Sequence, residues 1–190
     1  MSTTQHSNND TNGVDVDRLV QTIDAVKADP ELARFQFRAE TEWVGGARSR
    51  TRVRNFRQAG KKVEGRDQPL ELEGDEPDVL LGSDTAPNAV ETVLHALTSC
   101  LSVGFVYNAA ARGIDVESLE FRLDGDLDLR PFLGISQDAR PGYEGIRVRY
   151  RVKSNAPRAQ IEELCNYVQA TSPVMDIIRN PVPVEVVMEE

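Results

Sequence analysis

Residues 87–113 read PNAVETVLHALTSCLSVGFVYNAAARG, and this stretch decides the fold. Pro87 suits the first turn of a helix and Gly113 is a natural C-terminal stop, so we predict one long helix over residues 87–112. At 1.5 Å per residue such a helix is about 39 Å long. Its C-terminal half, from Phe105 onward, is apolar on nearly every side. A helix of this kind must be covered by other elements on several sides.

Cys100 lies in the middle of this predicted helix, between the small hydroxyl residues Ser99 and Ser102. Two interpretations stay open for its thiol. It could be a buried structural group, as free cysteines often are. It could instead be a nucleophilic thiolate, which in apolar surroundings needs a nearby cation or hydrogen-bond donors. Cys165 lies on the apolar stripe of another predicted helix, which favours a core role.

The segments before the long helix have separate signatures. Residues 1–14 are small and polar, and we expect them to be disordered. Residues 15–29 repeat apolar side chains at helical spacing and precede Pro30, which predicts a helix. Strands are expected within residues 33–82. They comprise an alternating, half-buried strand at 35–43, an arginine-rich strand at 48–56, and shorter strands near Leu72 and Val79.

Residues 117–190 are expected to supply further strands and a second helix. The elements indicated by the periodicity are antiparallel strands at 119–129 and 146–152, a helix that opens near Asn155 and is interrupted at Ser172-Pro173, and a final strand at 184–188. Long strands with one polar face, combined with long apolar helices, predict an α+β fold. We therefore expect one domain over residues 15–190.

Composition narrows the class of protein. The formal net charge of -9 over 190 residues would repel phosphate backbones, and no basic stripe is long enough for a nucleic-acid footprint. No apolar run has the length of a membrane span and no signal peptide is present, so we expect a cytoplasmic protein. Two cysteines are too few for a disulfide framework. His6 and His95 stand apart, so neither a metal site nor a bound cofactor is expected.

Three groups of residues carry a family resemblance. Residues 88–101 resemble the helix that bears the peroxidatic cysteine in the OsmC and organic-hydroperoxide-resistance superfamily. Ser172-Pro173-Val174 is similar to the motif on the second helix, which is normally Cys-Pro-Val or Cys-Pro-Tyr. Residues 125–129, 140–143 and 181–184 resemble connecting strands of the OsmC-like branch, so the resemblance spans about residues 35–190. It implies antiparallel sheets that wrap two long central helices, in an intertwined homodimer with active sites at the subunit interface.

The resemblance also implies roles for individual residues. Cys100 matches the cysteine that attacks the hydroperoxide, and Arg48, after a double glycine, is the match for the arginine that stabilises the thiolate. The family's glutamate would orient that arginine, but its position holds Val90, with Glu91 one residue late. The nine-residue step to Cys100 turns Glu91 to the opposite helix face, where it suits the helix dipole. Ser172 replaces the second, resolving cysteine.

These departures leave two principal hypotheses. The first is a thiol-dependent peroxidase that reduces organic or hydrogen peroxide through Cys100, with a low-molecular-weight thiol or dithiol protein as external reductant. The alternative is a non-catalytic or weakly active dimeric, stress-associated protein that binds a small apolar ligand in the family pocket. Thiol or acyl transfer at Cys100 is a third possibility with no specific sequence support.

Overall fold

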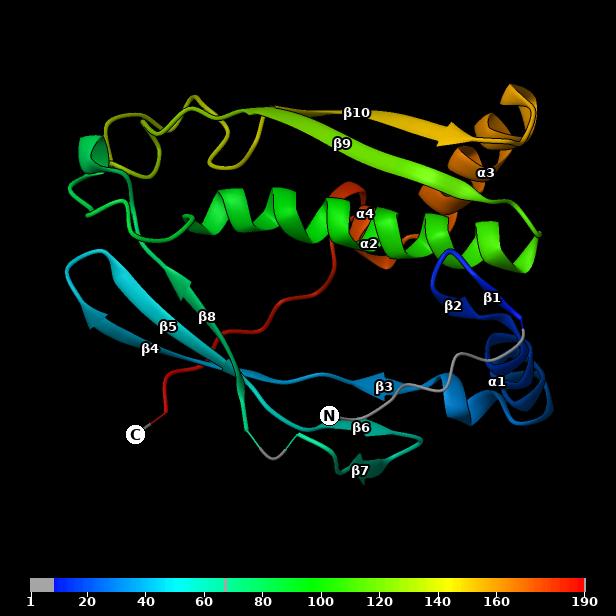
Figure 1. Ribbon diagram of the computed structural model, residues 1–190. Helices are drawn as coiled ribbons and strands as arrows, with labels where there is room; N and C mark the ends of the chain where they lie inside the picture. The colour runs from blue at the N-terminus through cyan, green and yellow to red at the C-terminus, as the bar shows by residue number, and fades with distance from the viewer. Residues whose placement is uncertain (1–8, 67, 190) are drawn as a thin grey trace. The chain divides into compact units, whose positions relative to one another are not determined.

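The computed structural model describes residues 9–66 and 68–189 (Figure 1). Its contacts divide the chain into two compact units, whereas the sequence predicted a single domain over residues 15–190. One unit, called here the cysteine unit, comprises the residues up to Val14 and those from Leu94 onward. The other, called the strand unit, comprises Asp15–Val93.

The long helix is α2, Ala89–Ala111, and its ends follow from local chemistry. Asn88 precedes it, and its side-chain Oδ1 accepts a hydrogen bond from the Glu91 amide at 2.9 Å. The Glu91 carboxylate in turn accepts from the Asn88 amide at 2.9 Å, which completes a capping box. The sequence analysis had placed Pro87 in the first turn of the helix. In the structure Pro87 lies before the helix, which begins at Ala89. Gly113, with φ of +67°, closes the other end.

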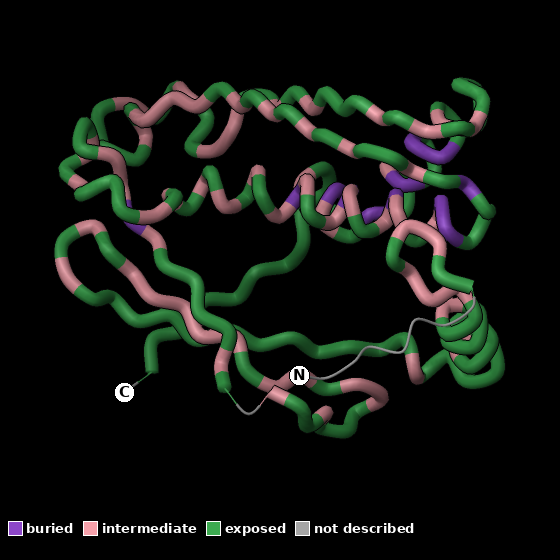
Figure 2. Tube along the Cα trace, viewed as in Figure 1, coloured by how far each residue is buried: buried purple, intermediate pink, exposed green. Residues whose placement is uncertain are grey.

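The cysteine unit is built around α2, two strands and two further helices. These are β9, Val116–Asp126; β10, Gly145–Ser154; α3, Arg158–Thr171; and α4, Pro173–Arg179. The two strands pair antiparallel with Phe121 opposite Tyr150, and the apolar face of this ribbon packs on the helices. Leu97, Leu101 and Phe105 of α2 join Leu164 and Val168 of α3 in the core (Figure 2). The predicted strand pair and the helix break at Ser172-Pro173 are thus present, although β9 ends before Leu127.

A short hairpin occupies part of the segment that was expected to be disordered. Strands β1, Asp10–Thr11, and β2, Val14–Asp15, flank Asn12 and Gly13, both with positive φ. The Asn12 side chain donates to the Ile114 carbonyl and accepts from the Val116 amide, which fixes the hairpin at the start of β9. The expectation is therefore wrong for residues 9–14, and residues 1–8 lie outside the described chain.

The strand unit contains two three-stranded antiparallel sheets, β3-β6-β7 and β4-β5-β8. Its elements are α1, Val16–Ala28; η1, Pro30–Ala33; β3, Phe35–Gln36; β4, Ala39–Gly45; β5, Arg48–Val53; β6, Phe56–Gln58; β7, Lys61–Val63; β8, Leu70–Gly74; and η2, Asp78–Leu80. The helix predicted at 15–29 is confirmed. The strand predicted at 35–43 is instead split between two sheets, and Trp43 is 76% exposed where half-burial was expected. Val79 lies in η2 and not in a strand.

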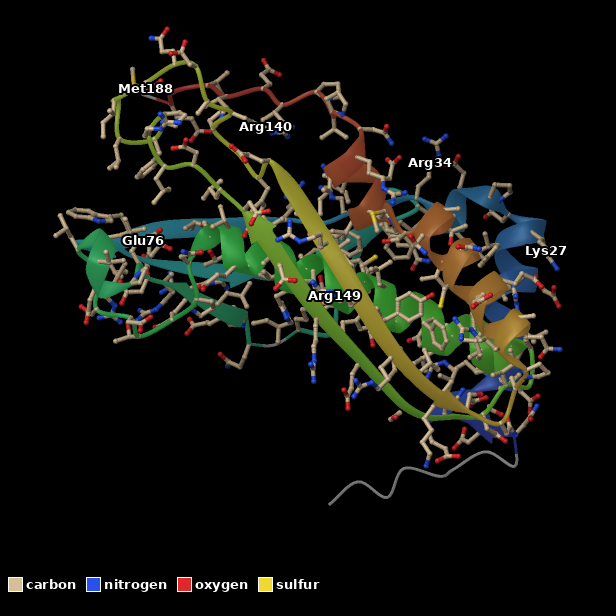
Figure 3. The ribbon with its side chains drawn as sticks, turned by 90° about the horizontal axis from the view of Figure 1, so that it is seen from above. Lys27, Arg34, Glu76, Arg140, Arg149 and Met188 are labelled. Atoms are coloured by element: carbon tan, nitrogen blue, oxygen red, sulfur yellow. The ribbon has the colours of Figure 1, made fainter. Side chains whose placement is uncertain are left out.

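The C-terminal strand expected at residues 184–188 is absent. Residues 180–189 belong to no helix or strand, and Met188 is 96% exposed (Figure 3). Pro181 and Pro183 lack the amide hydrogens that a sheet ladder requires. No strand among the described residues pairs with this segment.

Asp75 organises the loop between β8 and α2. This residue is buried, and its carboxylate accepts hydrogen bonds from the amides of Glu76, Ser83 and Thr85 and from the Thr85 hydroxyl. The bonds from Thr85, first through its hydroxyl and then through its amide, lower the pKa of Asp75 from the usual 3.8 to about 2. The carboxylate thus ties together ten residues of irregular chain just before the capping box of α2.

Replacing Asp75 by asparagine is expected to lower the melting temperature at neutral pH by several degrees. The amide group cannot accept all four hydrogen bonds, because one of its ends is itself a donor. Because folding lowers this pKa, the stabilisation is present above pH 3.8 and is lost as the pH falls through about 2. Thermal unfolding between neutral and strongly acidic pH should therefore show a weaker acid dependence in the variant. Asp78→Asn, at an exposed site in the same loop, is the matched control; equal effects of the two changes would contradict this role.

Helix α2 is also, by length and composition alone, apolar enough to cross a membrane. Five of its residues are buried in the protein: Leu97, Leu101, Phe105, Ala109 and Ala110. Four of these five, Leu97, Leu101, Phe105 and Ala109, belong to the hydrophobic core of the cysteine unit.

Candidate active site

Cys100 and Ser172 meet in the cysteine unit. The Ser172 hydroxyl donates a hydrogen bond to the Cys100 sulfur, with 3.1 Å between Oγ and Sγ. Ser172 is itself buried and caps α4, where its Oγ accepts the Met175 amide at 3.2 Å. Because the amide occupies a lone pair of the hydroxyl oxygen, the hydroxyl proton is directed to the sulfur. The Cys100 sulfur is therefore the acceptor in this contact.

The sequence around both residues explains why they approach so closely. Gly104 lies one turn after Cys100 in α2, and Val168 lies one turn before Ser172 in α3. A side-chain carbon built at Gly104 would stand 3.2 Å from the Val168 Cγ1, tighter than ordinary contact. The missing side chain at Gly104 therefore lets Val168 rest close to α2. Pro173 then begins α4 and leaves Ser172 in the extended conformation that an N-cap requires.

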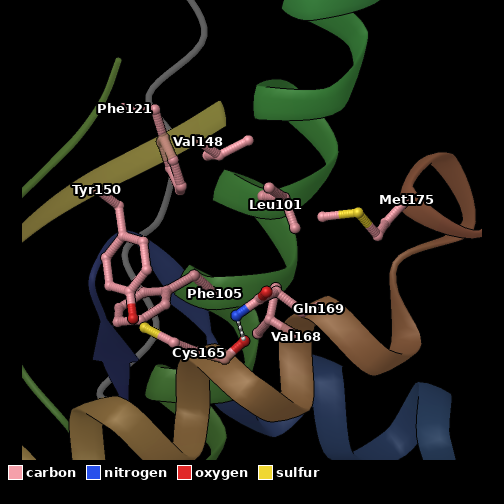
Figure 4. A pocket seen from close by; sticks show the side chains of 9 residues that line it. All are labelled: Leu101, Phe105, Phe121, Val148, Tyr150, Cys165, Val168, Gln169 and Met175. Carbon is pink, nitrogen blue, oxygen red and sulfur yellow. Dashed lines mark hydrogen bonds between the residues drawn. The ribbon is translucent and has the colours of Figure 1, made fainter. Parts of the chain in front are cut away.

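An apolar cavity lies in the core of the cysteine unit, and neither Cys100 nor Ser172 lines it (Figure 4). It has a volume of about 50 Å³, and its lining includes Leu101, Met175, Tyr150 and Cys165. Phe105, Phe121, Val148, Val168 and Gln169 complete the lining. The cavity is much smaller than the roughly 300–1,000 Å³ typical of sites for drug-sized ligands. It has room only for a small group.

Cys165 lines this cavity and has a different environment from Cys100. Burial raises the pKa of its thiol, and a hydrogen bond with the Tyr150 hydroxyl partly offsets the rise. Burial, and then the contact with Cys165, raises the pKa of Tyr150 to about 12. Both cysteines are free. Cys165 is therefore a buried, protonated core thiol at neutral pH, as its apolar helix stripe indicated.

Iodoacetamide is expected to alkylate Cys100 at least about tenfold faster than Cys165 in the folded protein near neutral pH. The thiolate is the reacting form, and burial of Cys165 both limits access and raises the pKa of its thiol above the usual 9.0. Its rate should increase only as the pH rises toward that higher value, or when the protein unfolds. Peptide mass spectrometry over a time course measures both sites; equal rates in the folded protein would contradict the environments described.

The remaining residues predicted for the site have partners of their own. Glu91 serves the capping box, nine residues before Cys100 and about 13 Å away along the helix axis. Arg48 begins β5 in the strand unit, and its guanidinium lies 3.7 Å from the Glu73 carboxylate. Glu73 also pairs with Arg50 at 3.2 Å. The structure therefore brings Cys100 to Ser172, and Arg48 to a carboxylate that was not anticipated.

Two contributions were missed at the sequence level. Ser172 had been identified only as the replacement of a cysteine, whereas its hydroxyl is a donor to the thiol. Glu73 had not been singled out, although Glu71 and Glu73 alternate along a short strand as the arginines do along β5. That matching alternation is the signal that could have paired the two strands.

Comparison with known proteins agrees with this architecture. Residues 82–187, more than half of the chain, match the family model described as OsmC-like protein. No curated protein sequence matches the chain.

Several solved structures share the fold. A putative osmotic stress induced and detoxification response protein from Psychrobacter arcticus aligns with a TM-score of 0.56 at 13% identity, covering 75% of this chain and 88% of that one. An organic hydroperoxide resistance protein OsmC from Legionella pneumophila aligns with a TM-score of 0.53 at 16% identity, covering 76% and 89%. A putative organic hydroperoxide resistance protein from Vibrio cholerae, with captopril bound in one of its active sites, aligns with a TM-score of 0.51 at 14% identity, covering 76% and 85%.

At these identities the structural matches show a shared fold, whereas the family model rests on the sequence itself. Its span includes α2 with Cys100, the β9–β10 ribbon and the helix break at Ser172. The chain therefore belongs to the OsmC-like protein family.

Proposed function

We propose that this protein is a thiol-dependent hydroperoxide reductase in which Cys100 is the nucleophile. The observation that carries the proposal is the 3.1 Å hydrogen bond from the buried Ser172 hydroxyl to the Cys100 sulfur. Cys100 itself is only partly buried in the single chain, which supports access of peroxide to its sulfur. A donor on one side and access on another are what a reactive thiolate needs.

The proposed cycle needs no second cysteine. The Cys100 thiolate attacks one peroxide oxygen, the O–O bond breaks, and the departing alkoxide takes a proton to become an alcohol, or water in the case of hydrogen peroxide. Sulfur is oxidised to a sulfenic acid. An external thiol then displaces water to give a mixed disulfide, and a second thiol equivalent releases the Cys100 thiol and an oxidised disulfide of the reductant.

The small size of the apolar cavity in the same unit supports small substrates. It is lined by Leu101, the residue after Cys100, and its space of about 50 Å³ could receive a short alkyl group but not a large aromatic one. Hydrogen peroxide and short-chain alkyl hydroperoxides are therefore the proposed substrate class.

Arg48 is the proposed cation for the thiolate in the assembled protein. Its ion pair with Glu73 supports this role, because a carboxylate that holds a guanidinium also orients it. Glu73 would then do what the resemblance assigned to a glutamate at the position of Val90. Arg48→Lys should lower the rate of thiol oxidation, since a lysine keeps the charge but loses the fork geometry.

A homodimer is proposed as the working form. Val103 and Tyr107 of the apolar helix α2 are 53% and 49% exposed, and Val184, Val186 and Met188 of the C-terminal segment are more exposed still. Apolar surface of this extent favours association. Sedimentation should give about twice the chain mass of 21.1 kDa. We further propose a cytoplasmic location, where thiol reductants are available.

Peroxide consumption in the presence of dithiothreitol tests the function. The expected rate exceeds that of free cysteine by at least about tenfold, and ethyl hydroperoxide should react faster than the bulky cumene hydroperoxide. The non-catalytic alternative, which rests on the same apolar cavity, predicts a rate no greater than that of free cysteine. That result, together with a co-purified apolar ligand, would replace the catalytic proposal.

A further inference from the structure

The strand unit carries a basic segment within an acidic chain. Residues 34–66 contain ten Lys and Arg side chains and three Glu side chains, a net charge of +7, whereas the whole chain carries -9. Positive charges gathered on such short strands repel one another, so negative charges are needed nearby to neutralise them.

Glutamates of neighbouring strands neutralise part of this segment. Arg50 pairs with Glu73 at 3.2 Å, and Arg52 pairs with Glu42 at 2.8 Å and with Glu71 at 3.2 Å. These side chains lie on one face of the β4-β5-β8 sheet, where Glu42 stands opposite Arg50, and Glu73 and Glu71 stand opposite Arg50 and Arg52. On this face, charges of opposite sign meet across the strands.

Beyond the paired ends of β4 and β5, arginines have no carboxylate partner among the described residues. Ala39 and Val53 are the last residues paired between β4 and β5, and Arg38 and Arg54 are the next residues of the chain beyond this pair, outside both strands. Within the described chain neither Arg38 nor Arg54 has a carboxylate partner, and Arg38 donates only to the Gln36 side chain, at 3.3 Å. Both arginines line one hollow, and like charges held close together repel each other. The Arg–Glu face therefore ends beside these two side chains, called here the arginine pair, which an anion would neutralise.

The space beside this arginine pair is large enough for a ligand. A hollow of about 340 Å³ is lined by Arg38, Arg54 and Lys62, together with the paired Arg52 and the carboxylate of Glu40. Lys62 also forms an ion pair with Glu64, with 2.9 Å between its Nζ and the carboxylate. The volume falls within the range of roughly 300–1,000 Å³ found for small-molecule sites.

A further polar atom at this hollow has no partner. Asn55 also lines it, and its Oδ1 is buried without a hydrogen-bond partner among the described residues. Buried polar atoms are nearly always satisfied in folded proteins. An oxygen acceptor in a cationic site suits a ligand that carries a hydroxyl or a protonated oxygen beside its negative charge.

We propose that Arg38, Arg54 and Lys62 bind the phosphoryl group of a small soluble molecule. A phosphate monoester carries close to two negative charges and three acceptor oxygens, which match three cationic donors. Arginine forks bind such groups through paired hydrogen bonds. Asn55 accepts a hydroxyl of the same ligand. This site is built from strand-unit residues and does not depend on the chemistry at Cys100.

Calorimetric titration with inorganic pyrophosphate, at constant ionic strength set with chloride, tests the site. We expect saturable binding that is weakened by about tenfold or more in Arg38→Gln and in Arg54→Gln, the effect of losing one charge-assisted interaction. Arg149→Gln is the matched control, since Arg149 lies on β10 and pairs with Asp124 (Figure 3). It removes the same charge and should leave binding unchanged. In phosphate-free buffer Arg54→Gln should melt no lower than the wild type, because it separates two like charges.

Four results would overturn the proposal. The first is no saturable binding of pyrophosphate, and the second is equal weakening by Arg149→Gln, which would indicate non-specific attraction. The third is binding of a single-stranded oligonucleotide or of anionic phospholipid vesicles that pyrophosphate does not displace. A substantial drop in the melting temperature of Arg54→Gln without phosphate would also count against it, since the arginine pair would then be stabilising by itself.

Discussion

Replacing Cys100 by serine is expected to lower peroxide turnover by at least about tenfold, to the background of the added thiol. Serine keeps the size of the side chain and can still contact the Ser172 hydroxyl, so the fold should persist. Its hydroxyl, however, cannot be oxidised as a thiolate can. The measurement is peroxide consumption with dithiothreitol, alongside thermal unfolding to confirm that the variant is folded.

Cys165→Ser is the matched control for this change. Cys165 is buried and hydrogen-bonded to Tyr150, so its replacement should alter stability more than turnover. A folded Cys100→Ser variant with wild-type turnover would remove Cys100 from the mechanism. Loss of turnover in Cys165→Ser, with an unchanged melting temperature, would assign the chemistry to the thiol of Cys165.

Replacing Ser172 by cysteine is expected to convert the proposed one-cysteine cycle into a two-cysteine cycle. The present Oγ–Sγ distance is 3.1 Å, and a disulfide of about 2.05 Å requires only a small further approach of the two side chains. One equivalent of hydroperoxide should therefore produce an intramolecular disulfide between Cys100 and the introduced cysteine, with no external thiol. Mass spectrometry of the intact chain and of its peptides detects this bond.

Ser99→Cys provides the comparison for this gain of function. Ser99 neighbours Cys100 in α2, but its hydroxyl contacts His95 at 3.3 Å and not the cysteine sulfur. The Ser99→Cys variant adds the same thiol on a side of α2 that does not face the Cys100 sulfur, and it should give no such disulfide. If Ser172→Cys instead accumulated sulfinic acid at Cys100 without a disulfide, the two positions would not meet in solution as the structure has them.

Periodicity was sufficient for the long elements near the site. Apolar spacing together with Pro87 and Gly113 predicted a helix over 87–112, and α2 runs from Ala89 to Ala111. The break before α4 could also be predicted, because the proline starts a new helix and the serine before it is a favourable N-cap. The contact between Cys100 and Ser172, by contrast, joins residues 72 positions apart. Spacing alone does not contain that information, and only the resemblance pointed to it.

Other features were not predicted, because local sequence signals conflicted or did not report on tertiary contacts. Asn12-Gly13 is a strong hairpin signal, but the polar composition around it favoured disorder. Asp75 gave no sign of its burial, since its four hydrogen bonds come from residues up to ten positions away. Alternation at Trp43 identified two faces of a strand but not whether anything covers them, and both are exposed in the single chain.

The most direct test of the central claim is trapping of the oxidised cysteine. The folded wild-type protein would be treated with one equivalent of hydrogen peroxide and then with dimedone, which labels sulfenic acid, and its peptides would be analysed by mass spectrometry. We expect a peroxide-dependent dimedone adduct on Cys100 and none on Cys165. An unlabelled Cys100 that remains a free thiol after this treatment would contradict this claim.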